Sequence, residues 1–141
     1  MVPSPRMMLA SPRTEAELLG LVDSFFRAYE KGDVDAIMGL LAKDPNLLLI
    51  GTESEERCVG PDEVRALFER DVTEAESMSV DMGWHQVCAS GPVAWVAAEI
   101  NVRVIDKGEE LVTPVLFSAV FEQRLQRWMI VQIHLSIPAG L

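Results

Sequence analysis

The sequence predicts one α+β domain in which helices come first and an antiparallel sheet follows. Apolar residues recur at helical spacing in the first half of the chain, whereas from about Ser77 they alternate with a period of two. The connections between the alternating runs are short, which is typical of neighbouring antiparallel strands. A chain of 141 residues has room for one sizeable core. We therefore expect a single domain.

The first helix is expected to run from Thr14 to Gly32. Thr14 and Glu17 have the spacing of a capping box, in which each side chain satisfies a free backbone donor at the start of a helix. Gly32 suits the left-handed conformation in which many helices end. The residues before Thr14 include prolines and only a short apolar run. We interpret 1–13 as a flexible leader and 14–141 as the domain.

A short second helix and a short strand are expected next. Asp33 can cap a helix of about two turns. Residues 47–50 form an apolar run of the kind found in a short buried strand. The segment 53–59 is polar and acidic, which indicates a loop or an irregular hairpin.

A third helix is expected to begin at Pro61, because proline fits the first turn of a helix. Its inward stripe contains Val64 and Phe68 at helical spacing. Asp71 occupies the next position of this stripe, where the pattern would place an apolar residue. A carboxylate on the inward side of a helix needs a partner or a cavity.

Four extended runs form the second half of the chain, over residues 78–89, 93–105, 112–123 and 128–137. In the last three runs, one row of side chains is apolar and the opposite row mixes aromatic, polar and charged residues. The apolar row includes Ala94, Val96, Ala98, Ile100, Val115, Phe117, Ala119, Val131, Ile133 and Leu135. The mixed row includes Trp95, Glu99, Ser118, Trp128, Gln132 and His134.

The mixed row is interpreted as the lining of a ligand cavity, because it combines apolar walls with a few polar groups. In this interpretation the helices pack on the mixed row and the apolar row faces away from them. An exposed apolar row of this size needs a cover. We therefore expect a homodimer in which a second copy packs against Ala94, Val96, Ile100, Val131 and Ile133.

The charge of the chain argues against two classes of partner. It has 12 Lys and Arg against 22 Asp and Glu, a formal net charge of −10. Such a surface repels nucleic acid phosphates and anionic lipids, so neither nucleic acid nor a membrane is expected as a partner.

Cys58 and Cys88 match no metal-ligand spacing and are expected to be reduced, as in a cytoplasmic protein. With two histidines and no glycine-rich phosphate loop, no metal and no cofactor is expected.

Several short motifs occur in an order and spacing that are fairly specific together. They are Tyr29 to Ala36, Asp44-Pro45, Gly51-Thr52, Gly60 to Glu63, Ala94-Trp95 and the ending Trp128 to Pro138. On these motifs the chain resembles the nuclear transport factor 2-like superfamily, in particular its SnoaL-like branch. The resemblance implies a cystatin-like fold: three N-terminal helices packed on a strongly curved, mixed or antiparallel sheet that forms a cone with an internal pocket.

The resemblance also implies which ligands are disfavoured. Members of this branch usually carry an Arg-x-Thr pair at the start of the third long strand. Leu116 and Ser118 stand at these positions here. The arginine that would hold an anionic ligand is therefore missing.

Six residues are candidates for contact with a ligand: Tyr29, Trp95, Ser118, Trp128, Gln132 and His134. The two tryptophans suit the walls of a pocket for a flat apolar molecule, although such residues more often belong to an ordinary core. Tyr29 is the last member of the first helix's apolar stripe, so its hydroxyl points into the cavity or out to solvent.

Three residues are candidates for acid–base chemistry: Asp71, Glu99 and His134. A carboxylate in an apolar cavity has a raised pKa and can act as a base near neutral pH, where histidine also titrates. Each has a structural alternative. Asp71 can pair with a cation, Glu99 can pair with Arg103, and His134 can bond to Ser136 or to a backbone carbonyl.

We expect a small-molecule-binding domain with a semi-apolar pocket. One alternative is a cofactor-independent isomerase, dehydratase or hydrolase with Asp71 or Glu99 as the base and His134 or Tyr29 as the donor. A second alternative is a dimerisation or assembly domain. The superfamily includes ketosteroid isomerase and scytalone dehydratase as well as binding and assembly domains, so the resemblance in fold does not choose among these functions.

Overall fold

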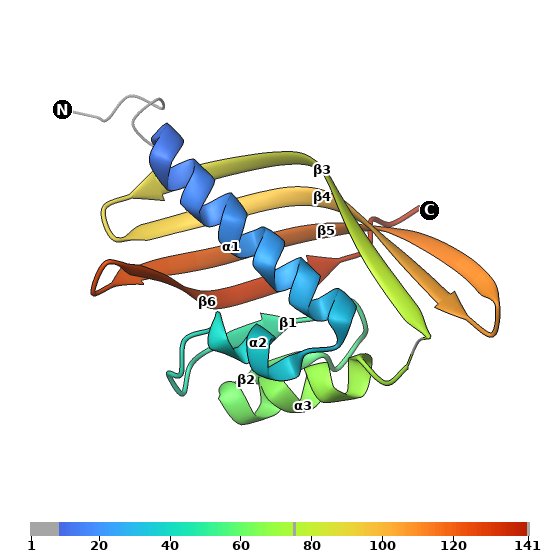
Figure 1. Ribbon diagram of the computed structural model, residues 1–141. Coiled ribbons are helices and arrows are strands. Elements are labelled where there is room, and N and C mark those ends of the chain that lie inside the picture. Colours follow the sequence, from blue (N-terminus) through green and yellow to red (C-terminus); the bar gives the residue numbers. More distant parts are fainter. Residues whose placement is uncertain (1–8, 75, 141) are drawn as a thin grey trace.

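The computed structural model describes residues 9–74 and 76–140, and Figure 1 shows their arrangement. Helices come first and long strands follow, as the periodicity predicts. None of the helices in these ranges is long and apolar enough to cross a membrane. The elements are α1 (Pro12–Lys31), α2 (Val34–Gly39), β1 (Leu48–Ile50), β2 (Arg57–Val59), α3 (Pro61–Asp71), β3 (Ser77–Ser90), β4 (Val93–Asp106), β5 (Glu109–Arg124) and β6 (Arg127–Ser136).

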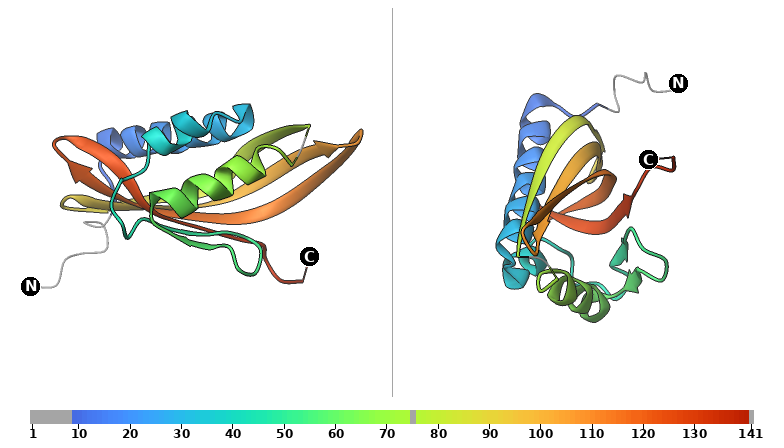
Figure 2. Two further views of the ribbon diagram at one scale, coloured as in Figure 1. Left: turned by 90° about the horizontal axis from the view of Figure 1, so that it is seen from below. Right: turned by 90° about the vertical axis from the view of Figure 1, so that its right-hand side faces the viewer.

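One six-stranded sheet forms the body of the fold, in the order β2-β1-β6-β5-β4-β3. The four long strands pair antiparallel with their sequence neighbours, and β1 joins β6 in parallel, so the sheet is mixed. Figure 2 shows that the sheet is strongly bent. Helix α1 crosses one of its faces, and α2 and α3 lie at the end where β1 and β2 are found (Figure 1). The predicted α+β architecture with a curved sheet is confirmed.

Helix α1 begins two residues earlier than the capping-box pattern predicts. Ser11 is the N-cap, and its hydroxyl accepts a hydrogen bond from the backbone N–H of Thr14 at 3.2 Å. Pro12 then occupies the first turn, where its missing N–H costs nothing. Residues 9–13 are part of the fold and not a loose leader, since the backbone N–H of Ala10 donates to the carbonyl of Val87 at 3.3 Å. The rest of the predicted leader, residues 1–8, lies outside the described residues.

The apolar row of the sheet faces the helices, so the predicted orientation of the two faces is wrong. Ala94, Val96, Ala98 and Ile100 of β4 are at most 4% exposed. They belong to one core with the inward stripes of α1 and α3, to which Phe25 and others contribute. The physical reason is that the helices are themselves amphipathic and gain most by burying the face that carries no polar group. The chain's own helices cover the row assigned to a dimer interface, which removes the reason for expecting a homodimer through it.

A β-bulge in β6 changes which side chains face the core. Val120 pairs with Gln132 and Phe121 with Ile130, so Val131 is left without a partner on β5. An extra residue in one strand shifts the alternation by one position. Trp128 and Ile130 are therefore buried before the bulge, and Ile133 is buried after it.

The outer edge of the sheet, at β3, is covered by α1. Glu30 accepts a hydrogen bond from the backbone N–H of Val80 at 2.8 Å, and Arg27 donates to the carbonyl of the same residue at 2.9 Å. The two side chains thus satisfy both backbone groups of Val80, which a further strand would otherwise bond.

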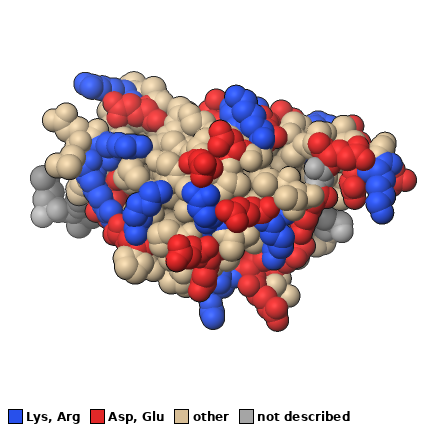
Figure 3. Space-filling model, turned by 60° about the horizontal axis from the view of Figure 1, so that its bottom comes forward, with Lys and Arg blue, Asp and Glu red and all other residues tan. Residues whose placement is uncertain are grey.

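Charged side chains of both signs are interspersed on the surface. On the face shown in Figure 3, Lys and Arg side chains lie among Asp and Glu side chains. Most ion pairs in the described ranges are exposed, such as Arg103 with Asp81 at 3.2 Å and with Glu110 at 3.0 Å. Pairs of this kind contribute little to stability.

Candidate functional site

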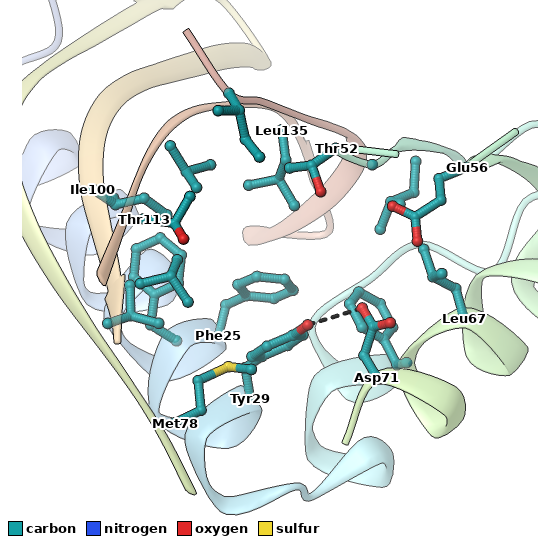
Figure 4. Close-up of a pocket in the computed structure, with 18 residues that line it drawn as sticks. Phe25, Tyr29, Thr52, Glu56, Leu67, Asp71, Met78, Ile100, Thr113 and Leu135 are labelled. Atoms are coloured by element: carbon teal, nitrogen blue, oxygen red, sulfur yellow. Dashed lines mark hydrogen bonds between the residues drawn. The ribbon is translucent and has the colours of Figure 1, made fainter. Parts of the chain in front are cut away.

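A cavity of about 230 Å³ lies between the helices and the bent sheet. Figure 4 shows its lining, which comes from every layer of the fold. Helices α1 and α3 and the β1–β2 connection form one side, and strands β3 to β6 form the other. The lining residues are Phe25, Phe26, Tyr29, Leu49, Gly51, Thr52, Glu56, Leu67, Phe68, Asp71, Met78, Val80, Ile100, Val102, Thr113, Val115, Leu135 and Ile137.

A hydrogen bond joins the two polar residues that α1 and α3 bring to the cavity. The hydroxyl of Tyr29 donates to Oδ2 of Asp71 at 2.9 Å (Figure 4). Tyr29 lies in the last turns of α1, and Asp71 is the final residue of α3. Both positions follow from the helical stripes, which turn these residues inward together with their apolar neighbours.

The surroundings of Asp71 raise its pKa on balance. Burial raises the pKa of Asp71 above its ordinary value of 3.8, and the hydrogen bond from Tyr29 acts in the opposite direction. The nearby Glu56 carboxylate raises this pKa further, whereas the Arg70 guanidinium, 3.6 Å from Oδ1, lowers it. Exposed Glu74 adds to the increase. The net direction is upward, as expected for a carboxyl group at the edge of an apolar cavity.

The same surroundings keep Tyr29 protonated. Burial, and after it the negative charge of Asp71, raises the pKa of the Tyr29 hydroxyl. Tyr29 is therefore a neutral phenol that donates to the carboxylate.

Glu56 closes one side of the cavity. One of its carboxylate oxygens accepts a hydrogen bond from the backbone N–H of Glu53 at 3.1 Å, and the other pairs with Arg70 of α3. Its side chain folds over Gly51, where a Cβ atom would lie only 2.9 Å from Cβ of Glu56. Glycine is thus required for Glu56 to reach this position.

Aromatic rings form much of the helical wall. The ring of Phe68 lies 5.9 Å from the ring of Phe25 and 5.9 Å from that of Tyr29, both in edge-to-face geometry. Together with the aliphatic side chains of the sheet they make most of the surface apolar. The polar groups lie mainly at the side formed by α3 and the β1–β2 connection (Figure 4).

The structure brings together only two of the residues that the sequence marks as candidates, Tyr29 and Asp71. The others do not line the cavity. Glu99, Ser118 and His134 are exposed on the opposite face of the sheet, and Trp95 and Gln132 lie half-buried there. They fail to meet the cavity because the mixed row points away from the helices.

Trp128 lies on the opposite face of the sheet from Gln132 and His134, with which it was predicted to line the cavity. It is buried on the inner face, because it precedes the bulge at Val131, and its indole N–H donates to a carboxylate oxygen of Glu17 at 3.2 Å. It lies outside the cavity lining. The expectation that it shares one enclosed space with Gln132 and His134 is wrong.

Three polar lining residues are absent from the sequence-based candidates: Thr52, Glu56 and Thr113. Thr113 continues the row of Val115 and Phe117, so strand alternation could have found it. Glu56 lies in the acidic segment that precedes β2, where no periodicity indicates direction. Among the described residues, no group of three or more His, Cys, Asp or Glu side chains could hold a metal ion.

Comparison with known proteins identifies the fold family. The model of the family described as "SnoaL-like domain" matches residues 19–140. The chain belongs to this family. No curated protein has a significantly similar sequence. The predicted resemblance to the SnoaL-like branch is thus confirmed over nearly the whole chain.

Solved structures share the fold of this SnoaL-like domain at low sequence identity. A nuclear transport factor 2-like superfamily protein from Salmonella enterica has 16% identity and a TM-score of 0.83, covering 93% of this chain and 95% of that one. A protein with a cystatin-like fold from Nostoc punctiforme has 13% identity and a TM-score of 0.78, with 95% and 98% covered. A "putative dehydratase" from Streptomyces avermitilis has 18% identity and a TM-score of 0.81, with 92% and 100% covered. At these identities the likeness concerns the fold alone.

Proposed function

We propose that this SnoaL-like domain binds a small, largely apolar molecule in the cavity and anchors it at the Tyr29–Asp71 pair. The observation that carries the proposal is the 2.9 Å hydrogen bond between these residues at one side of a mostly apolar space. Ligand sites typically combine apolar walls with a few polar groups that fix orientation.

The volume of the cavity suits a small molecule. A cavity of about 150 Å³ accepts one benzene ring, and this one measures about 230 Å³. A ligand with one ring and a short polar substituent therefore fits. Because the Tyr29 hydroxyl already donates to Oδ2 of Asp71, the polar groups available to a ligand are Oδ1 of Asp71, which also lies 3.6 Å from Arg70, and the side chains of Thr52, Glu56 and Thr113.

A variant that fills the cavity tests this proposal. Thr113→Phe places a ring in the space from β5, whereas Leu116→Phe places the same ring at an exposed position on the opposite face of that strand. We expect native mass spectrometry of the purified protein to detect a bound small molecule in the wild type and in Leu116→Phe, and not in Thr113→Phe. Equal retention by all three proteins would contradict a ligand site in this cavity.

Acid–base catalysis is a second candidate, which the raised pKa of Asp71 supports. A carboxylate with a raised pKa, held by a tyrosine in an apolar cavity, suits proton abstraction from a bound neutral substrate. The fold shared with a "putative dehydratase" is compatible with this chemistry. The test is a mass-spectrometric screen for loss of water from small hydroxy-carbonyl compounds. Turnover should rise with pH through the raised pKa of Asp71 and disappear in Asp71→Asn.

A further inference from the structure

The ionisable side chains that line the cavity are all acidic or phenolic. Among the described residues, the lining contains Asp71, Glu56 and Tyr29, and no lysine, arginine or histidine. Arg70 contacts both carboxylates, but its side chain is about half exposed and lies outside the cavity. One guanidinium therefore faces the carboxylates of Asp71, Glu56 and Glu74, which leaves an excess of negative charge at this side.

The uncharged polar groups do not offset this excess. Thr52 and Thr113 are hydroxyls that can accept as well as donate hydrogen bonds. The Tyr29 proton is already engaged with Asp71. An anionic ligand would meet carboxylates and no cation among the described residues that line the cavity, so its burial would be unfavourable.

Aromatic rings line the same cavity as the carboxylates, and one of them, Tyr29, contacts Asp71 directly. Phe25, Tyr29 and Phe68 line the cavity on the side of α1 and α3. Ring faces attract cations within about 6 Å of the ring centroid, and the attraction is stronger where water is excluded. Carboxylates beside aromatic rings thus form an environment that stabilises a positive charge better than a neutral or a negative group.

We propose that the ligand of this cavity is an organic cation: an amine with a small apolar body, whose ammonium group contacts Asp71 and Glu56 while its body packs against the aromatic and aliphatic walls. This inference rests on the proposed binding function and names the chemical class of the ligand. Part of the cost of burying the ammonium group is offset by its ion pair with two carboxylates.

Three probes of nearly equal shape test the charge preference: phenethylamine, 2-phenylethanol and phenylacetate. Calorimetry should give at least about tenfold tighter binding of the amine than of the alcohol, the size expected for one charge-assisted contact. Phenylacetate should not bind. Asp71→Asn and Glu56→Gln should each remove most of the preference for the amine, whereas Glu99→Gln, which neutralises an exposed carboxylate on the outer face of the sheet, should leave it unchanged.

The outcomes separate the two proposals. If the alcohol binds as tightly as the amine, or if phenylacetate binds, the cation inference is overturned and the binding function stands. If none of the probes binds to the folded wild type, both are overturned. Circular dichroism of each variant shows whether it is folded.

Discussion

The hydroxyl of Tyr29 lies 2.9 Å from Oδ2 of Asp71, and this hydrogen bond ties the end of α1 to the end of α3 across 42 positions of sequence. Both residues are polar members of stripes that are otherwise apolar. Burying either one alone would leave an unsatisfied group. Their contact explains how a carboxylate is tolerated at the edge of the core, and it places a proton donor and an acceptor at one point of the cavity.

Removal of the Tyr29 hydroxyl should raise the pKa of Asp71 further. The hydrogen bond from Tyr29 lowers this pKa, so in Tyr29→Phe only Arg70 continues to oppose the effect of burial. We also expect a loss of about 1–2 kcal/mol in the free energy of unfolding, because the carboxylate loses its donor. Carbon-detected NMR titration of the carboxyl group measures the shift. Thr113→Val, which removes another hydroxyl of the cavity, is the control and should leave the titration of Asp71 unchanged.

The stability of Asp71→Asn relative to the wild type should increase as pH rises. Folding raises the pKa of Asp71 above 3.8, so the native state binds this proton more tightly than the unfolded chain does. The wild type therefore loses stability as pH increases from the unfolded pKa to the folded one, and the loss is complete above the folded pKa. Asparagine cannot ionise, so the variant does not lose this part of its stability as pH rises. Thermal melts of both proteins between about pH 4 and pH 8 measure the difference; a difference that is independent of pH would show that Asp71 titrates normally.

Trp128 should matter far more to stability than His134, although strict alternation over β6 puts both on one face. The indole is buried before the bulge and the imidazole is exposed after it. Trp128→Ala should cost about 3–5 kcal/mol through loss of burial and an unfilled cavity. His134→Ala should change stability by less than about 0.5 kcal/mol. Denaturant unfolding of the two variants decides the matter, and similar losses in both would mean that the bulge at Val131 is misplaced.

Protection of the Val80 amide at the edge of β3 should depend on Glu30. In Glu30→Ala the backbone N–H of Val80 loses its acceptor at a position that is 3% exposed. Leaving a buried donor unsatisfied costs about 1–3 kcal/mol, and exchange of the Val80 amide hydrogen should become faster. Asp23→Ala serves as the control, because Asp23 is exposed and contacts Arg27 on the same helix, and it bonds to no strand in the described part of the chain. Unchanged exchange at Val80 in the Glu30 variant would show that its amide is protected in another way.

The sequence by itself determined the elements and the inward position of Asp71. Helical spacing and strand alternation are local properties of the chain, so they predict α1, α3 and the four long strands to within a few residues. The stripe of α3 likewise places Asp71 beside Phe68, because a helix fixes the direction of each side chain relative to its neighbours. The motifs from Tyr29 to Pro138 indicated the SnoaL-like family, which the match over residues 19–140 confirms.

Only the tertiary structure decided which face of the sheet meets the helices and which residues form the cavity. Alternation separates two rows of side chains but does not say which row the helices cover. That choice depends on packing between distant segments. It places Glu99, Ser118, Gln132 and His134 on the face away from the helices, outside the cavity that they were predicted to line. The bulge at Val131 then separated Trp128 from this group. Glu56 reaches the cavity through its ion pair with Arg70 and its close approach to Gly51. These contacts form only when the β1–β2 connection folds against α3, and no local pattern encodes them.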